Sequence, residues 1–320
     1  MNSTITFTNR VDHFLARWGY KRSGHRVTPG LYQLGTPDAD SPVFVSANYT
    51  LSFDALRSNL NGINAYILVL DTKGINVWCA AGKGTFGTDE LVRQITFTDL
   101  SDVVSHRKII VPQLGAPGIS ALDVQRQTGF RVEYGPVRAS DLPEYLRTGK
   151  ATPEMRRVKF PIQDRIILAP IELVYIALKA IIVAIVLWFV AGTIAALAVI
   201  AAVIAGTVLF PVLLPFLPTK DFTTKGFILG VLVAIPFSFT YASSPGLPLW
   251  ALVVGSVVPL LIMPAVVAFL GLNFTGSTTF TSRTGVRKEI FRYVPLMTVM
   301  TAVGVITGVS LGVCRILGVI

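Results

Sequence analysis

Cys79 is the residue in this chain whose chemistry most needs an explanation. It lies in the segment NVWCAAGK at 76–83, between a tryptophan and a run of small residues. The other of the two cysteines, Cys314, lies in a distant apolar stretch, and no CxxC occurs. These two thiols cannot by themselves build an iron–sulfur cluster or a structural zinc site. Because an isolated cysteine is more often a buried, inert thiol than a reactive one, spacing alone favours a packing role for Cys79.

Known phosphate-binding patterns fail in the same segment. A loop of the form GxxxxGK[ST] that used Gly82 and Lys83 would need a glycine where Val77 stands. Gly84 also takes the place of the required hydroxyl residue. GxGxxG is also absent at the end of the first expected strand, directly after residue 70, so we predict neither a nucleotide site nor an NTPase.

The cobalamin-binding signature DxHxxG is absent as well. Asp12 is followed directly by a histidine and then by FLA, which does not fit that spacing. The three histidines, His13, His25 and His106, lack glycine support in a ligand-side loop, and His106 is expected to be structural or exposed. We therefore predict no histidine ligand in this chain.

Alternating strands and helices are predicted around Cys79. The apolar run AYILVL at 65–70 is typical of a buried strand, and the pattern then continues to about residue 149. The expected strands are 65–70, 106–115 and 130–137, and the expected helices are 88–95 with Thr88 as N-cap, 121–129 closed by Gly129, and 140–149. This order predicts an α/β, Rossmann-like domain with a mainly parallel sheet.

Three glycine- and proline-rich loops follow these strands, at 71–87, 112–119 and 134–139. Ligands of parallel α/β sheets bind at the carboxyl ends of the strands, which is where the three loops fall. Such loops can bring backbone close to a flat or polyphosphate ligand. We therefore expect a binding site at this edge, with Cys79 in the first loop.

Charge is divided unevenly along the chain. Residues 1–165 hold 35 charged residues, whereas residues 166–320 hold 11. The total of 14% charged residues is well below the roughly 25% of an ordinary soluble domain. The split predicts a cytoplasmic α/β domain at 1–160 followed by an all-α transmembrane domain at 161–320. The net charge of +10 is not accompanied by interleaved basic and aromatic residues, so nucleic acid is not an expected partner.

Five apolar stretches predict five membrane spans, at about 166–190, 193–217, 226–241, 249–270 and 293–317. Of their connections, 219–225 carries Lys220 and Lys225, and 272–292 carries four basic residues, whereas the other two are uncharged. Positive loops face the cytoplasm, so the N-terminus is expected inside and the C-terminus outside a multi-pass cytoplasmic membrane protein. The first residues lack the apolar core of a signal peptide, which agrees with this orientation.

Two features inside the spans each allow a structural and a functional interpretation. Gly304, Gly308 and Gly312 form a GxxxGxxxG row, which favours close helix packing within the bundle or at a homodimer face. Glu172 and Lys179 lie on one face of the first span, where they are either functional or snorkelling to the boundary. The spans lack the density of acidic residues and histidines typical of a proton-driven transporter, which disfavours that class.

The segment Asn76–Lys83 resembles the signature N-[VI]-W-C-A-[AS]-G-K of the corrinoid-binding mercury methyltransferase family, without departures. Residues 109–120 and 128–146 are similar to the corrinoid domain of the corrinoid iron–sulfur protein large subunit. Residues 273–289 resemble the loop before the last span of the methyltransferase family, whose architecture is also a corrinoid domain followed by five spans. The resemblance covers most of the chain from about residue 60 onward, and no site is assigned to residues 1–60.

The resemblance implies a cobalt corrinoid as cofactor, with the Cys79 thiolate as the axial cobalt ligand and catalytic residue. A thiolate is a soft, strongly donating ligand that needs no partner cysteine. The small neighbours permit close approach of the ring, and Lys83 either supports the thiolate or is solvated. The implied cofactor-binding residues are Asn76, Val77, Trp78, Cys79, Ala80, Ala81, Gly82, Lys83, Thr85, Gly115, Pro117, Gly118, Gly135 and Pro136.

The resemblance also implies partners. The expected electron donor is a ferredoxin-like protein with two [4Fe–4S] clusters, because no iron–sulfur cluster is expected in this chain. The expected methyl donor is a folate-dependent methyltransferase, and the expected substrate is Hg(II).

The leading hypothesis is thus a membrane-anchored corrinoid-dependent methyltransferase that forms methylmercury. The first alternative is a membrane-tethered corrinoid methyl carrier of one-carbon metabolism, similar to the acetyl-CoA pathway. The second is a membrane transporter with a regulatory α/β domain, in which Cys79 is inert.

Overall fold

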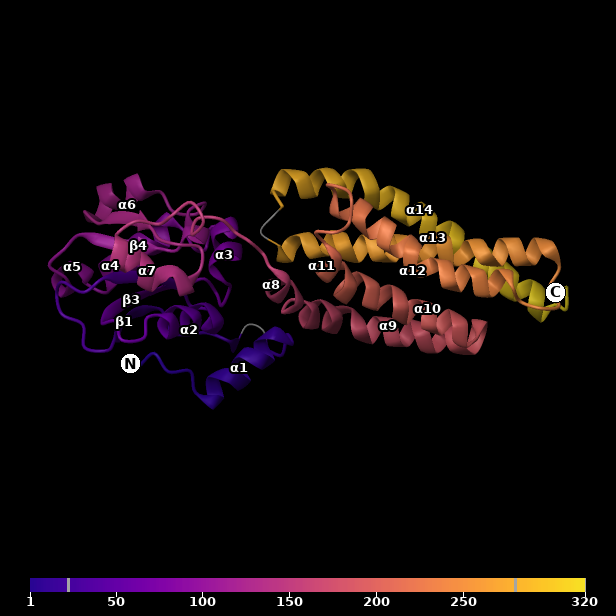
Figure 1. The fold of residues 1–320 in the computed structure, drawn as a ribbon, viewed down its shortest axis with the longest axis horizontal. Coiled ribbons are helices and arrows are strands. Elements are labelled where there is room, and N and C mark those ends of the chain that lie inside the picture. The colour runs from indigo at the N-terminus through magenta and orange to yellow at the C-terminus, as the bar shows by residue number, and fades with distance from the viewer. Residues whose placement is uncertain (22–23, 279–280, 320) are drawn as a thin grey trace. The chain divides into compact units, whose positions relative to one another are not determined.

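The computed structural model describes residues 1–21, 24–278 and 281–319. Its backbone divides into two compact units, Met1–Lys159 and Phe160–Ile320, which are drawn in Figure 1. The first unit is a mixed α/β domain and the second is helical.

A five-stranded sheet forms the centre of the first unit (Figure 1). Its strands are β1 (Gly30–Leu34), β2 (Val43–Ala47), β3 (Ala65–Leu70), β4 (Lys108–Val111) and β5 (Arg131–Tyr134), in the order β1-β3-β2-β4-β5. The pairs β2–β3, β2–β4 and β4–β5 are parallel, whereas the edge strand β1 is antiparallel to β3. The three predicted strands and the mainly parallel sheet are confirmed, and β1 and β2 are additions that the sequence pattern did not predict.

Helices cover both faces of this sheet. One apolar layer joins it to α3 (Val77–Lys83), α4 (Thr88–Phe97), α5 (Leu100–Val103) and α6 (Ala121–Thr128). The other joins it to α2 (Thr50–Asn59) and α7 (Leu142–Thr148). The helix α1 (Phe7–Arg17) is attached to α2 by polar contacts. The three predicted helices are confirmed as α4, α6 and α7, and this three-layer arrangement is that of an α/β fold.

Two local expectations need correction. Thr88 is not an N-cap, because Gly87 holds that position and the Thr88 hydroxyl instead accepts a hydrogen bond from the Ser120 amide at 2.9 Å. The segment of Cys79 is not an open loop, because residues 77–83 form the short helix α3. Gly129, by contrast, closes α6 as expected, with a left-handed φ of 77°.

The second unit is built from long apolar helices. Among the described residues, five helical segments are long and apolar enough to cross a membrane, at Ile162–Ala191, Thr193–Leu213, Phe222–Ala242, Leu249–Ser277 and Thr284–Ile316. They consist of α8 (Ile162–Ile166) with α9 (Ala169–Ala191), α10 (Thr193–Ile204) with a π-helical stretch and α11 (Phe210–Leu213), then α12 (Phe222–Ala242), α13 (Leu249–Phe274) and α14 (Arg283–Ile316). The predicted number of apolar helices is confirmed by length and composition.

Their boundaries differ from those predicted. The connection expected at 272–292 is mostly helical, because α13 continues to Phe274 and α14 begins at Arg283. Within the segment 273–289, residues 279–280 lie outside the described part of the chain. Lys225, expected in a loop, lies in the first turn of α12, where its ammonium donates to the Leu214 carbonyl at 2.9 Å.

Close helix packing in the second unit depends on glycines of α12. A Cβ at Gly226 would lie 2.5 Å from the Cα of Ala268, and one at Gly230 would overlap the Cα of Pro264, both on α13. In the predicted GxxxGxxxG row, a Cβ at Gly304 would meet the Ile262 side chain. Packing within the bundle is therefore confirmed for Gly304, and the backbone-to-backbone contact is made by α12.

A matched pair of substitutions tests this contact. We expect Gly230→Ala to lower the free energy of unfolding by roughly 1–3 kcal/mol, because the added methyl group meets a backbone that cannot move aside alone. Gly312→Ala is the control, since a Cβ there meets nothing within 4 Å. Thermal unfolding of the full chain in one detergent measures both variants. Equal midpoints for Gly230→Ala and Gly312→Ala would contradict the assignment.

Candidate functional site

Asn48 organises the loop between β3 and α3. It follows β2 directly, is 2% exposed, and accepts hydrogen bonds at Oδ1 from the Thr72 amide at 3.1 Å, the Thr72 hydroxyl at 2.9 Å and the Gly74 amide at 2.9 Å. Its Nδ2 donates to Asp71 Oδ1 at 3.1 Å. One buried amide therefore satisfies three hydrogen-bond donors of this loop, which are costly to leave unpaired. No site was predicted before residue 60, so the sequence pattern missed Asn48, whose only signal is its position after a buried strand.

Glu90, on α4, binds Asp71, which is the first residue of the same loop. Its carboxylate accepts a hydrogen bond from the Asp71 amide at 2.8 Å and two from the Arg93 guanidinium. Burial by itself would raise the pKa of Glu90, but these hydrogen bonds and the one from Gln94 outweigh it and lower that pKa. The carboxylate therefore stays ionised and keeps the loop attached to α4.

The loop leads into α3 through a side-chain cap. Asn76 is the N-cap, and its Oδ1 accepts a hydrogen bond from the Cys79 amide at 2.9 Å. The helix ends at Gly84, whose φ of 84° lies in the left-handed region that glycine adopts without strain. Ala80 and Ala81 face the apolar core, whereas Val77, Trp78 and Cys79 are each partly exposed. Cys79 is thus placed at the surface of a capped helix.

The loops after β3 and β4 contact each other through Phe86. Its ring is fully buried, and a Cβ at Gly115 would overlap this ring. A Cβ at Gly118 would overlap the Phe86 carbonyl oxygen and lie 3.1 Å from the Cα of Ala81. The close approach that these two glycines permit is therefore made by the chain itself.

The loop after β5 joins the same edge. The Gln113 amide donates to the Pro136 carbonyl at 3.4 Å, and the Tyr134 hydroxyl donates to the Ile119 carbonyl at 2.6 Å. Burial raises the pKa of Tyr134, so the hydroxyl keeps its proton and remains a donor. The predicted convergence of the three loops at the carboxyl edge of the sheet is observed.

The predicted cofactor-binding residues differ in how accessible they are. Gly115, Gly135 and Pro136 are buried beneath the chain's own atoms, and Gly118 is partly covered. The exposed members are Asn76, Gly82, Lys83 and Pro117, and a Cβ at Gly82 would meet nothing within 4 Å. A ligand at this edge can therefore approach α3 and Pro117 directly, while the buried glycines shape the surface from below.

Thr85 provides a test of whether this edge suits a bound group. Its Oγ1 is buried and is among the three described side-chain atoms of that kind without a hydrogen-bond partner. Such an atom is typical of a place where a ligand supplies the missing partner. Among the described residues, no three His, Cys, Asp or Glu side chains lie together to hold a bare metal ion. A single thiol beside open surface suits a metal that brings its other ligands with it, as a corrinoid does.

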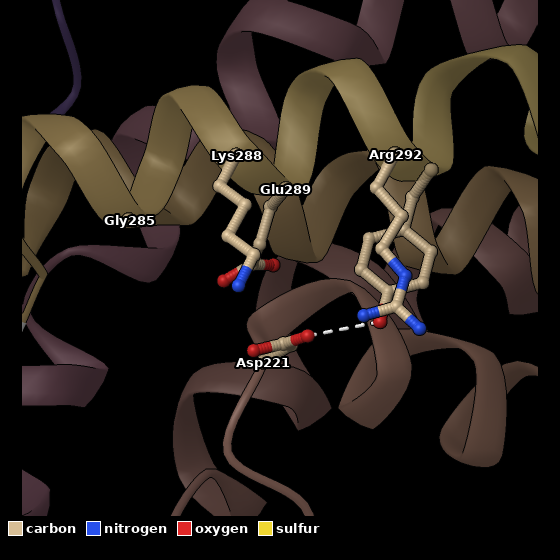
Figure 2. A pocket seen from close by; sticks show the side chains of 6 residues that line it. Asp221, Gly285, Lys288, Glu289 and Arg292 are labelled. Carbon is tan, nitrogen blue, oxygen red and sulfur yellow. Dashed lines mark hydrogen bonds between the residues drawn. The ribbon is translucent and has the colours of Figure 1, made fainter.

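A second polar cluster lies in the helical unit. The buried Glu289 on α14 accepts hydrogen bonds from the Phe222 amide at 3.2 Å and the Thr223 amide at 2.9 Å, at the start of α12. The Tyr293 hydroxyl donates to Asp221 Oδ2 at 2.9 Å. Figure 2 shows Lys288 and Arg292 beside these groups around a small pocket. Its carboxylates are already used as partners of amides and a hydroxyl, so we assign this cluster to holding α12 against α14.

The two charges noted in the first span are not paired with each other in the described contacts. Glu172 Oε1 accepts a hydrogen bond from the Ser277 hydroxyl at 2.6 Å, at the end of the segment Leu249–Ser277. Glu172 is thus a contact between the first and fourth apolar helices.

Residues 19–146 match the sequence profile of a family described as CO dehydrogenase/acetyl-CoA synthase delta subunit. The chain is 36% identical over 127 residues to the acetyl-CoA decarbonylase/synthase complex subunit gamma of Methanopyrus kandleri, which is 39% of the chain and 27% of that protein. The same subunits of Methanothermobacter thermautotrophicus and Methanocaldococcus jannaschii are each 32% identical, over 39% of the chain and 27% and 26% of those proteins. The chain thus spans about a quarter of the length of the curated relatives it matches.

The family match lies within the first unit, and its range spans positions 48 and 79. The predicted likeness to a subunit of acetyl-CoA metabolism is therefore confirmed for this part of the chain. The family match begins at residue 19, so the likeness to this family extends further towards the N-terminus than the segments 109–120 and 128–146. Mercury methylation stays a prediction.

Replacing Asn48 tests its part in the site. We expect Asn48→Ala to lower the free energy of unfolding by about 2–4 kcal/mol, because the Thr72 and Gly74 amides then lose a buried acceptor. Amide hydrogen exchange at residues 72–79 should rise together with this loss. Asn59→Ala is the control, since the Asn59 side chain is partly exposed and its Nδ2 donates one hydrogen bond to the Ala55 carbonyl. Unchanged exchange in Asn48→Ala would mean that the loop holds its shape without this residue.

Proposed function

We propose that this chain is a membrane-tethered corrinoid protein that carries a methyl group in one-carbon metabolism of the acetyl-CoA type. The observation that supports it most is the match of residues 19–146 to subunits of acetyl-CoA synthase and decarbonylase complexes. The five apolar helices support the tether, with the first unit on the cytoplasmic side. This is the first alternative of the sequence analysis, and it has more support than mercury methylation.

In this proposal the corrinoid lies against α3 and the loop that contains Pro117. When bound, a cobalt corrinoid supplies a metal that accepts a methyl group and passes it to a second acceptor. Cys79 would bind the metal through its thiolate, and the Asn76 cap would fix the backbone that carries the thiol. Thr85 is partly exposed beside this surface, although its Oγ1 is buried, and Gly82 leaves room for the group. Lys83 is exposed at the end of the helix, about one turn after Cys79, and we propose it as a contact of the bound group.

An electron donor follows from the cysteine count. A four-cysteine cluster cannot be built from Cys79 and Cys314, so reduction of the metal requires another protein. We propose a small protein with two [4Fe–4S] clusters in this role, and a folate-dependent methyltransferase as the source of the methyl group. Both belong to the proposal and rest on the resemblance of the segment 76–83.

Metal analysis and absorbance of anaerobically purified protein test the cofactor. We expect about one cobalt per chain and a corrinoid absorbance spectrum. Cys79→Ala should shift that spectrum and lower methyl transfer roughly tenfold or more, because the metal loses its thiolate donor. Cys314→Ala is the matched control and should change neither measurement. A corrinoid spectrum that is identical in wild type and Cys79→Ala would contradict thiolate ligation, and protein without cobalt would favour the transporter hypothesis.

A second candidate function is methyl transfer to Hg(II). It is favoured by one observation, the partly exposed Cys79 inside the complete signature NVWCAAGK. The two candidates differ in the acceptor, so the methyl-loaded protein should be offered Hg(II) and a nickel acceptor in parallel. Transfer to nickel alone supports the carrier of one-carbon metabolism, whereas transfer to Hg(II) that is lost in Cys79→Ala supports methylmercury formation.

A further inference from the structure

The helix α1 presents an apolar stripe to solvent. Phe7, Val11, Phe14 and Trp18 follow one another at spacings of four, three and four residues, which places them on one helical face. They are 81%, 40%, 58% and 41% exposed, respectively. A contiguous exposed stripe with three aromatic residues indicates a surface that is covered by something else.

The opposite face of α1 is polar, and this polar face is the one that contacts the domain. His13 Nε2 lies 2.8 Å from Asp54 Oδ2 on α2, and Asp12 Oδ2 accepts from the Thr50 hydroxyl at 2.7 Å. Ala16, on the same face, is 2% exposed. The amphipathic pattern of α1 is therefore inverted relative to an ordinary surface helix, whose apolar side faces the core.

Several contacts hold this inverted helix in place. Thr6 and Asn9 form a reciprocal capping box at its start. The buried Arg57 guanidinium donates to Asn9 Oδ1 at 3.1 Å and to the carbonyls of Asn2 and Thr4 at 3.0 and 2.8 Å. His25 Nδ1 lies 2.7 Å from Asp12 Oδ1. The exposed stripe is thus a fixed surface rather than a frayed end of the chain.

The charges beside the stripe are positive. Arg10, Arg17 and Lys21 are exposed, whereas the single acid of α1, Asp12, is engaged by His25 and Thr50. Phenylalanine and tryptophan beside arginine and lysine are the composition of helices that lie in the interface of an anionic bilayer. The matched residues begin at 19, so α1 and the apolar helices of the second unit both lie outside them.

We propose that the apolar face of α1 inserts into the interfacial region of an anionic phospholipid bilayer, the one that holds the chain's membrane helices. This inference rests on the membrane tether of the proposed function, which keeps lipid at a high local concentration near the first unit. Phe7, Val11, Phe14 and Trp18 enter the acyl boundary, while Arg10, Arg17 and Lys21 meet the phosphate groups. The first unit is thereby held at the membrane surface by a second attachment besides its link to the helical unit.

The test uses the full chain in nanodiscs of phosphatidylcholine with and without phosphatidylglycerol. We expect amide exchange at residues 7–18 to be slower by at least about fivefold with phosphatidylglycerol, the effect of one basic residue at an anionic surface. Brominated lipid should quench Trp18, measured as the difference between wild type and Trp18→Phe. Both effects should be lost in the double variant Phe7→Gln/Phe14→Gln and retained in Phe97→Gln, since Phe97 on α4 is 73% exposed.

Other outcomes overturn the inference. Equal exchange in the two kinds of nanodisc would do so, and so would protection in detergent that grows with protein concentration, which indicates a second copy of the chain. Protection that requires an added soluble partner would assign the stripe to that protein. A chain that stays outside nanodiscs would overturn the tether as well, whereas an incorporated chain with unprotected α1 overturns only this inference.

Discussion

The buried amide of Asn48 is the interaction on which the candidate site depends. It stands at the end of β2 and binds the backbone that leaves β3, so two neighbouring strands share one polar contact at their carboxyl edge. Because the loop is fixed in this way, α3 begins at a defined point, and the Asn76 cap can hold the Cys79 amide. Phe86 then packs the far end of the segment against Gly115. The thiol is thus positioned by groups that carry no reactive chemistry of their own.

The helical unit meets a different constraint, since backbone polar groups in an apolar environment need partners within the protein. The second apolar segment ends at Leu213, and buried cations bind the carbonyls at this end. The Arg165 guanidinium donates to the carbonyls of Pro211 and Val212, and the Lys225 ammonium donates to that of Leu214. Glu289 accepts amides at the start of α12. Charge inside this unit therefore serves helix ends, which accounts for charged residues in segments that otherwise read as membrane spans.

The long apolar patterns and the strands β3, β4 and β5 were predictable from the sequence, whereas β1, β2 and single side-chain contacts were not. The apolar run 65–70 and the five apolar stretches are recognisable in the sequence, because an element buried on all sides contains few polar residues. The strand β2 includes a serine among its five residues, and β1 is an edge strand of mixed exposure, so neither gives a continuous apolar run. The site residue Asn48 could not be found, since an asparagine after an unrecognised strand looks like any turn residue. The inverted face of α1 was equally hidden, because periodicity does not say which side faces the domain.

The cap of α3 has a consequence for how such a site can change over time. Asn76 binds the backbone amide at position 79 rather than the sulfur atom, so this cap hydrogen bond does not depend on which side chain that position bears. A lineage could therefore exchange the donor atom at position 79 for another while the loop, the cap and the packing beneath them stay constant. The hydrogen bond that caps the helix and the identity of the side chain at position 79 are therefore separable in this domain.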